Sequence, residues 1–339
     1  MLRTMFSVLP ELRIAVNARC GRACFFCRPS GEAVETLHDA ELDIETVLAV
    51  AKICEGFGVS YIKLTGGEPA FWSSLPECVG RLKDETKCRI EVVSRHSKIA
   101  ELVQALVRAG LDMLNISIDT LDPDLHQKIT GVNDLAKILD ALKMSISVGL
   151  PCKVNMVVLA QVNDHEIERV ITFCESLGVK IVKLLDLMVD IEDGTESFAR
   201  RIRLLGVNSL RELYLPLQNI TERLRRRAIK ERHFRQPGGL GNPMLGLTLE
   251  SGIEVILKDH HTGAWYGSIC KGCKYYPCNS ALMALRLTAD ARLQYCLLRE
   301  DLCIDTKLLD LRCLSMIIKD VLRVYNQAVF HAGPELRCK

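Results

Sequence analysis

Several features that would place a sequence in a broad class are missing from this one. No run approaches the ~18 consecutive apolar residues that a membrane-spanning helix needs. The formal net charge is only +2, which gives no general attraction to nucleic acids or anionic membranes. The N-terminal residues show no basic segment followed by a long apolar stretch, so we expect no signal peptide. We therefore predict a cytoplasmic protein whose partners include neither nucleic acid nor membrane.

Low-complexity tracts are absent as well. The 339 residues are 48% apolar and 25% charged, which is ordinary for a folded protein and excludes a mainly disordered or collagen-like chain. A chain of this length can bury a large core without disulfide bonds, and it suggests two domains or one barrel with an appendage. An oligomer is compatible with the sequence.

The residue present in excess is cysteine, at 15 positions. Because no signal peptide is expected, we predict reduced thiols, some of them bound to metal. Cys54, Cys88, Cys152 and Cys174 stand singly inside apolar patterns, and we interpret them as small buried hydrophobic residues. Two cysteine clusters do not fit that interpretation, and they support most of the functional argument.

The first two-thirds of the chain alternates between strand-like and helix-like patterns. Strand-like runs, rich in Val, Ile and Leu, lie at residues 12–16, 61–65, 89–93, 113–118, 153–159 and 181–188. Helical patterns lie between them, at residues 43–58, 99–110, 134–149 and 164–178. Such repeats predict parallel strands joined by right-handed crossovers. A partial barrel and an open doubly wound sheet both fit, and either places the chemistry at the carboxyl ends of the strands.

The pattern changes after Met188. Residues 190–235 are polar, helical in pattern and basic, and a solvated helix explains them more simply than an anion-binding face. The remaining predicted features are a turn-rich connection at 236–243, a hairpin at 245–257 with its turn near Ser251 and Gly252, and a terminal helix around 306–328.

The first cysteine cluster consists of Cys20, Cys24 and Cys27, directly after the first predicted strand. A disulfide would leave one thiol over, and structural zinc usually takes four protein ligands. Three cysteines in a tight loop suit three corners of a cubane iron–sulfur cluster, with one iron open to a small chelator. This spacing, with the aromatic Phe26 before the last cysteine, resembles the signature of the radical S-adenosylmethionine (SAM) superfamily.

A second motif supports that resemblance. Gly66, Gly67, Glu68 and Pro69 follow the next strand; the glycines allow backbone to approach a ligand closely, and the proline ends the strand. In the superfamily this motif receives the methionine amino group of SAM. The resemblance implies a [4Fe-4S] cluster on the three cysteines, a one-electron reductant such as flavodoxin or ferredoxin, and a 5′-deoxyadenosyl radical that abstracts a substrate hydrogen.

Further motifs narrow the resemblance to one family. Residues 115–124, 129–131, 149–151, 153–155, 162–164 and 284–296 resemble the family of GTP 3′,8-cyclase, the first enzyme of molybdenum-cofactor synthesis. The resemblance implies an α/β fold, a partial (β/α)6 TIM-like barrel with a C-terminal auxiliary iron–sulfur domain. We place the barrel with its basic helical extension at residues 1–235, and the auxiliary domain with the terminal helix at residues 236–339.

Residues that would contact SAM follow from the family's positions. Besides Phe26, Gly66 and Glu68 of the superfamily motifs, they are Gly67, Ser94, Ser117, Lys153 and Met188. The match at Ser94 is partial, because the family usually has Thr-Thr-Asn-Gly where this chain has Val93-Ser-Arg-His96.

A set of basic residues is expected on the substrate side. Arg13 matches an arginine of the family, whereas Lys63 and Lys183 stand where the family has arginines, so they keep the charge but lose the bidentate fork. Tyr61 replaces a usual lysine. Together with Lys153, these cations come from four strands and would converge at one rim, which suits a triphosphate or another phosphorylated nucleotide. Ordinary salt bridges at the barrel end are the alternative.

The second cysteine cluster contains Cys270, Cys273, Cys278 and Cys296. The family has three cysteines here and binds a second cubane, but in this chain the interval between Cys273 and Cys296 is longer and contains Cys278. Three ligands would leave an iron open to the substrate base, as in the family, whereas Cys278 as a fourth ligand would close the cluster. Tetrahedral zinc on the four thiols is a further alternative.

Substrate-side positions depart further from the family. Residues 283–286 read Met-Ala-Leu-Arg where the family has Asn-Arg-Leu-Arg, so Arg286 is kept as a substrate-side residue, and the family's Gly-Gly tail is not found at residues 330–339. We therefore predict GTP 3′,8-cyclase or a paralogue with a changed, nucleotide-like substrate. A peptide-modifying radical SAM enzyme, a small-metabolite enzyme of secondary metabolism and a non-enzymatic iron–sulfur or zinc protein are the alternatives.

Overall fold

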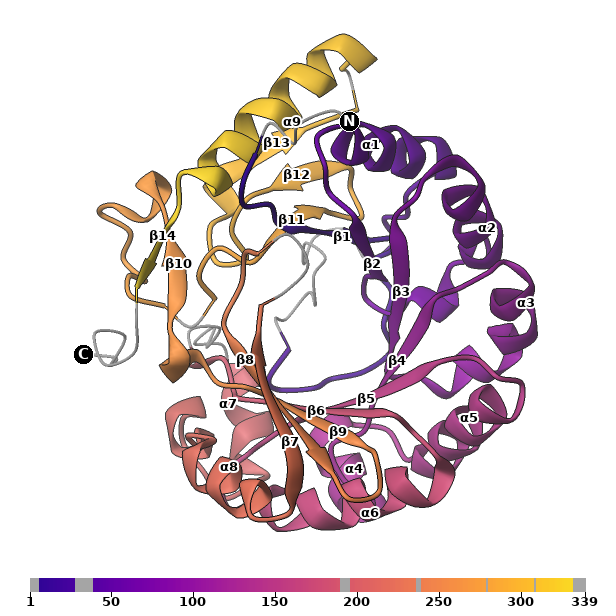
Figure 1. Ribbon diagram of the computed structural model, residues 1–339, viewed down its shortest axis with the longest axis vertical. Coiled ribbons are helices and arrows are strands. Elements are labelled where there is room, and N and C mark those ends of the chain that lie inside the picture. The colour runs from indigo at the N-terminus through magenta and orange to yellow at the C-terminus, as the bar shows by residue number, and fades with distance from the viewer. Residues whose placement is uncertain are drawn as a thin grey trace.

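The computed structural model describes residues 6–27, 39–189, 196–235, 239–278, 280–307 and 309–331. Most of the C-terminal tail considered above lies outside these residues. Helices and strands alternate along most of the described chain, and Figure 1 shows the strands curling into an incomplete ring with helices around its outer side. The predicted α/β fold with a partial barrel is confirmed, and the open doubly wound alternative is wrong.

Six parallel strands form the middle of the sheet. They are β1 (Glu11–Ala15), β2 (Tyr61–Thr65), β3 (Arg89–Ser94), β4 (Met113–Ser117), β5 (Cys152–Val157) and β6 (Ile181–Leu185). Each coincides with a predicted run to within a few residues. Alternate side chains such as Leu12 and Ile14 are fully buried against the outer helices, so Glu11 and Arg13 face the inside of the ring.

Helices cover the outer face of these strands (Figure 1). They are α1 (Ile44–Gly56), α2 (Leu75–Glu85), α3 (Val103–Arg108), α4 (Pro123–Thr130), α5 (Leu135–Ser147) and α6 (Ile167–Leu177). Asp43 caps α1 by accepting a hydrogen bond from Thr46 N at 2.7 Å. Gly178 ends α6 in a left-handed conformation that favours glycine. The four predicted helices are present, whereas α2 and α4 were not predicted.

The C-terminal third extends the same sheet at both edges. Beyond β6 lie β9 (Glu254–Lys258), β8 (Met244–Leu249) and β7 (Ala228–Phe234), and beyond β1 lie β11 (Ala284–Leu287), β12 (Arg292–Gln294) and β13 (Cys303–Asp305). Both β9 and β11 run parallel to the strand they join. The hairpin predicted at 245–257 is confirmed as β8–β9. The division of the chain at residues 235 and 236 stays a prediction, and strands from both sides of it share one sheet.

The basic segment before that division is only partly helical. It contains α7 (Glu196–Arg203) and α8 (Gln218–Arg225), but residues 228–234 form β7, so the helical prediction is wrong there. β7 is an edge strand that pairs with β8 on one side and is mostly exposed. Its exposed polar side chains would suit a helix or a strand equally well. Pairing with β8, which is close in space, decides for a strand, and the local sequence does not reveal that pairing.

A smaller layer lies beside the ring. β10 (Ala264–Tyr266) pairs antiparallel with β14 (Val329–His331), and the predicted terminal helix is α9 (Leu311–Asn326). The Tyr325 hydroxyl of α9 lies 2.8 Å from Ala284 O of β11 and 2.6 Å from Tyr295 O, next to β12, and its one hydrogen is shared between these acceptors. Short 3-10 turns occur at η1 (Pro69–Phe71), η2 (Ser97–Leu102), η3 (Asp164–Glu166), η5 (Leu210–Leu213), η6 (His260–Thr262), η7 (Ser268–Cys270) and η8 (Glu300–Leu302).

None of the described helices has the length and apolar character needed to cross a membrane.

Candidate active site

The loop with the first three cysteines leaves the carboxyl end of β1. Cys24 is buried, Cys20 is half-buried and Cys27 is exposed. Burial, together with the charges of Glu68 and Cys24, raises the pKa of the Cys20 thiol to about 11, and burial also raises the pKa of Cys24. Such thiols lose their protons when a cation binds them. Three thiols on one loop therefore fit a metal cluster better than a free nucleophile.

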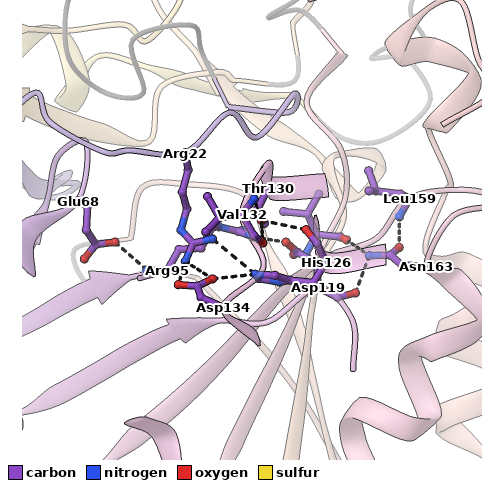
Figure 2. Close-up of polar contacts among 11 residues, drawn as sticks. Arg22, Glu68, Arg95, Asp119, His126, Thr130, Val132, Asp134, Leu159 and Asn163 are labelled. Carbon is purple, nitrogen blue, oxygen red and sulfur yellow. Dashed lines mark hydrogen bonds and ion pairs between the residues drawn. The ribbon is translucent and has the colours of Figure 1, made fainter. Parts of the chain in front are cut away.

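Buried polar contacts fix this loop to the helices beside it (Figure 2). Arg22, between the first two cysteines, donates two hydrogen bonds to the Asp134 carboxylate at 2.7 and 2.9 Å, and its side chain is 1% exposed. Ala23 N donates to Thr130 O at 3.0 Å. Thr130 ends α4 and Asp134 precedes α5, so the α4–α5 connection holds the cysteine loop in place. Sequence reasoning missed Arg22 and Asp134.

The glycine motif after β2 packs against the chain that leads into the cysteine loop. Gly67 N donates to Asn17 O at 2.8 Å, and Glu68 N donates to Arg19 O at 2.6 Å. A Cβ atom on Gly67 would lie 2.3 Å from Arg19 O, so only glycine fits. The close approach that glycine permits is thus to the protein's own backbone. The two sequence motifs form one structural unit.

The Glu68 side chain connects this unit to the end of β3. Its buried carboxylate accepts hydrogen bonds from Ser94 Oγ at 2.6 Å and from Arg95 N at 2.9 Å. Burial raises the pKa of Glu68. The Arg95 guanidinium lies 5.0 Å from the centre of the Phe26 ring and pairs with Asp119, and Figure 2 shows Arg95 between Glu68 and Asp119. Glu68, Ser94 and Phe26, predicted separately, are therefore linked through Arg95.

The other predicted SAM contacts lie on neighbouring strands. Ser117 is buried at the end of β4, and Met188 follows β6 and packs in one apolar cluster with Phe25 and Phe26. Lys153 differs from these, because it is the second residue of β5 and points into the ring, where Nζ donates to Glu91 Oε1 at 2.8 Å. The structure thus places Lys153 among the interior charges.

Two carboxylates sit among the cations inside the ring. Glu11 accepts hydrogen bonds from Lys63 Nζ at 2.8 Å and from Arg13 at 3.0 Å. Burial alone would raise the pKa of Glu11, but Lys63 and Arg13 outweigh it and lower the pKa to about 2. Burial likewise opposes ionisation of Glu91, but Lys63 and Lys153 lower its pKa. The salt bridges that were the alternative interpretation are therefore present for three of the predicted cations.

Lys183 on β6 differs from those cations. It is buried, and among the described residues no hydrogen bond or ion pair is formed by its ammonium group. Burial, and then the positive charges of Lys63, Lys153 and Lys258, bring its pKa well below the usual range. Lys258 on β9, which sequence reasoning missed, has its pKa lowered to about 8, mainly by burial. This part of the interior has an excess of positive charge.

Arg286 extends the cationic row on the other side. It is buried on β11 and lies in register with Arg13, which in turn lies in register with Lys63. Because aligned residues of parallel strands point to the same face, Arg286 also faces the interior. The predicted substrate-side residues Arg13, Lys63, Lys183 and Arg286 are therefore brought to one inner surface.

The second group of cysteines lines a single pocket beside the ring. Cys270, Cys273, Cys278 and Cys296 all contribute to its wall, together with Tyr266 and other residues. Cys273 N donates to Cys270 O at 3.2 Å, which makes a tight turn between these two. Burial raises the pKa values of Cys270 and Cys296. The four cysteines therefore share one pocket, and their role as ligands stays a prediction.

Comparisons with known proteins agree with this geometry. Residues 14–174 match the pattern of the radical SAM superfamily. A protein of Pyrococcus horikoshii named probable GTP 3′,8-cyclase is 31% identical over 297 residues, which cover 87% of this chain and 86% of that protein. The chain belongs to the GTP 3′,8-cyclase family of the radical SAM superfamily. A protein of Thermococcus kodakarensis with the same name is 29% identical, with 87% of each chain covered.

Solved structures support the fold of this radical SAM protein. SuiB of Streptococcus suis, in a crystal structure with its precursor peptide SuiA, gives a TM-score of 0.57 at 16% sequence identity. The match covers 86% of this chain and 60% of SuiB. A second structure, of SuiB bound to S-adenosylmethionine, gives a TM-score of 0.55 at 15% identity. At this identity the likeness concerns the fold alone.

Membership in the superfamily makes the protein an enzyme that uses a [4Fe-4S] cluster and SAM. The residues present fit these groups, because three thiols lie on one fixed loop after β1 and the glycine motif lies against that loop. The cysteine spacing alone was enough to predict that this loop fits the cluster. The roles of Arg95 and Asp119 were not predicted from the sequence, although the resemblance leads us to expect different residues at Val93-Ser-Arg-His96.

Proposed function

We propose that this protein is a radical SAM enzyme with two [4Fe-4S] clusters that abstracts hydrogen from a phosphorylated nucleotide, either GTP or a related substrate. The observation that supports the substrate class is the cationic interior, above all Lys183, which is buried without an ion pair among the described residues. Burying ammonium groups near one another is costly. A polyanion in the ring would offset that cost.

Cys20, Cys24 and Cys27 would hold the first cluster, and the bound cluster and SAM would together supply the 5′-deoxyadenosyl radical. The chain's own contribution is placement. The Arg22–Asp134 pair fixes the loop, and the hydrogen bonds from Gly67 and Glu68 to residues 17 and 19 set the distance between the loop and the SAM motif. Apolar packing of Phe26 with Met188 shields this region from water.

The basic residues on the inner surface of the ring would hold the substrate. Arg13, Lys63 and Lys153 form ion pairs with Glu11 and Glu91. Burial lowers the pKa values of Lys153, Lys183 and Lys258, and the last two lie nearest the unpaired part of the interior. A phosphate chain beside Lys183 and Lys258 would raise both pKa values, so these lysines would take up protons when the substrate binds. Arg286 would add a bidentate contact to phosphate or to a base.

The second cluster would be held by Cys270, Cys273 and Cys296 with Cys278 as a fourth ligand. This choice rests on the pocket, whose wall includes all four thiols. Four thiolates leave no open iron. The substrate would then be held by the basic interior rather than by a bond to iron, and the second cluster would relay electrons or stabilise the fold.

A screen for stimulated SAM cleavage tests the proposed function. Anaerobically reconstituted enzyme, reduced by flavodoxin or dithionite, is given SAM with GTP, with other nucleotides or with peptides, and 5′-deoxyadenosine is measured. We expect at least one nucleoside triphosphate to raise the rate several-fold over SAM alone. Stimulation by peptides and by no nucleotide would contradict the proposal and favour a peptide-modifying enzyme.

A further inference from the structure

A group of polar side chains at the carboxyl ends of β6 and β9 has no part in the proposed function. Asp186 directly follows β6, and Asp259, His260 and His261 follow β9. Tyr214 reaches the same place from the residue after η5. Asp186 N donates to Lys258 O at 3.2 Å, so the two strand ends lie side by side.

The nitrogen and oxygen atoms of this group converge. The Tyr214 hydroxyl lies 2.7 Å from His261 Nδ1 and 3.3 Å from His260 Nδ1. His261 Nδ1 also lies 3.2 Å from Asp259 Oδ1, and His260 Nδ1 contacts Asp186 Oδ2. Both imidazole Nδ1 atoms therefore face one hydroxyl and one carboxylate each. One ligand atom from each of Asp259, His260 and His261 lies within 4.8 Å of the other two.

Neighbouring backbone atoms hold the two carboxylates in this orientation. Asp259 Oδ2 accepts a hydrogen bond from Leu217 N at 3.0 Å, which leaves Oδ1 directed at His261. Asp186 Oδ2 accepts from His260 N at 3.0 Å. Backbone donors of this kind fix the orientation of metal-ligating carboxylates.

The group is sheltered but reachable. The side chains of His260 and Asp186 are 5% and 10% exposed, whereas that of His261 is 25% exposed. Atoms with lone pairs meet here from two carboxylates, two imidazoles and a phenol, and shared protons hold them together in the metal-free protein. A cation could replace those protons, and it could enter from the side of His261.

We propose that Asp259, His260 and His261 bind a divalent first-row transition metal ion such as Zn²⁺, with Asp186 and Tyr214 beside the same centre. Two imidazoles and a carboxylate favour such an ion over Ca²⁺ or Mg²⁺, which prefer oxygen ligands alone. Tetrahedral zinc with ligands at about 2.1 Å needs donors roughly 3.4 Å apart. Asp259 Oδ1 and His261 Nδ1 are 3.2 Å apart, close to that value.

The ion would fix the segment around Tyr214 over the barrel. Tyr214 packs in the apolar cluster that contains Phe26 of the cysteine loop and Met188. Leu217 N is bound to the proposed ligand Asp259. Metal binding would therefore stabilise a segment that packs in the same apolar cluster as the first cysteine loop, whatever the substrate of the enzyme is.

Zinc binding to the reconstituted full-length enzyme tests this site, because the cysteines then hold iron. Zinc that remains after dialysis and the thermal unfolding temperature are measured with and without Zn²⁺. We expect the wild type to keep about one more zinc per chain than His261→Ala, and only the wild type to gain thermal stability from zinc. His165→Ala, at a side chain that is 67% exposed, is the matched control and should behave like the wild type. Equal zinc in wild type and His261→Ala would overturn the proposal.

Crystals of the wild type soaked with Zn²⁺ give a test that needs no variant. Anomalous difference maps at the zinc edge should show a peak between His260 and His261. The absence of a peak there, including the case in which zinc appears only in the pocket of Cys270 and Cys296, would overturn the proposal. This readout is independent of SAM cleavage, so its failure is distinct from a failure of the proposed function.

Discussion

At the scale of single residues, the enzyme departs from its family mainly where charge and thiols are concerned. Lysines stand at positions 63 and 183, where the resemblance leads us to expect arginines, and Cys278, which the resemblance does not lead us to expect, lines the second pocket. A lysine can lose its proton when buried, whereas an arginine stays charged. If Lys183 holds the substrate as proposed, a lysine at this position should make binding sensitive to pH in a way that an arginine would not.

Binding of a triphosphate should be coupled to proton uptake at Lys183. In the free protein, burial and the charges of Lys63, Lys153 and Lys258 lower its pKa, and Glu11 acts against them. A bound polyanion raises that pKa, so protons are taken up on binding, and binding tightens as the pH falls from the pKa of the bound form towards that of the free form. Calorimetric titration of GTP in buffers of different ionisation enthalpy measures the uptake.

The matched variants for this titration are Lys183→Met and Lys143→Met. We expect the first to lose most of the proton uptake and to bind more weakly. Lys143 is about half exposed on α5, so its replacement should change neither quantity. Equal proton uptake in wild type and Lys183→Met would show that the linkage arises elsewhere.

Iron content tests whether Cys278, the fourth cysteine of the second pocket, is a cluster ligand. If Cys278 is a ligand, Cys278→Ala should reduce the iron of the reconstituted protein and change the low-temperature EPR spectrum of the second cluster, because one iron then lacks its thiolate. Cys313→Ala, at an exposed thiol near the start of α9, is the control and should retain full iron. Unchanged iron and an unchanged spectrum in Cys278→Ala would mean three cysteine ligands.

At the scale of elements, the connection between α4 and α5 holds the cysteine loop in position. The Asp134 carboxylate forms an ion pair with Arg22, and this pair is nearly inaccessible to solvent. Burial would raise the pKa of Asp134, but hydrogen bonds and the charge of Arg22 lower it to about 2. The pair therefore contributes stability above about pH 4, the pKa of an unfolded aspartate, and loses it as the pH falls towards 2.

Asp134→Asn should destabilise the protein by about 3 kcal/mol near neutral pH, because it leaves a buried guanidinium without its counter-charge. The difference from the wild type should shrink below pH 4. Urea unfolding across this pH range measures it. Asp140→Asn removes an exposed pair with Lys143 and should cost little. Equal effects of the two substitutions would contradict an anchoring role for Arg22 and Asp134.

The six central strands could be predicted because each is a short apolar run buried on both faces. α2 was not predicted because it ends at Thr86, without a glycine to mark its end. α4 does end at Gly131, but its eight residues are too few for a helical period to stand out. The pairing of β11 with β1 and of β9 with β6 joins residues far apart in sequence, which periodicity does not reveal. The charged residues of the interior could have been recognised in the sequence, because Glu11, Arg13, Lys63 and Glu91 interrupt otherwise apolar strands.

At the scale of the whole molecule, the curled sheet brings the two sequence motifs and the basic residues to one site. The cysteine loop and the glycine motif lie after β1 and β2, while Arg286, Arg13, Lys63 and Lys183 line the inner surface from strands on both sides. The C-terminal third completes this surface through β9 and β11. We therefore expect radical formation and polyanion binding to take place in one interior.

The most direct test compares guanosine with GTP as stimulators of SAM cleavage in the reconstituted, reduced enzyme. Both offer the same base and ribose, but only GTP offers a phosphate chain to the basic interior. The account predicts that GTP, or the matching triphosphate if the base differs, raises 5′-deoxyadenosine release several-fold, that the nucleoside has little effect, and that Lys183→Met loses most of the difference. Equal stimulation by nucleoside and triphosphate in the wild type would contradict it.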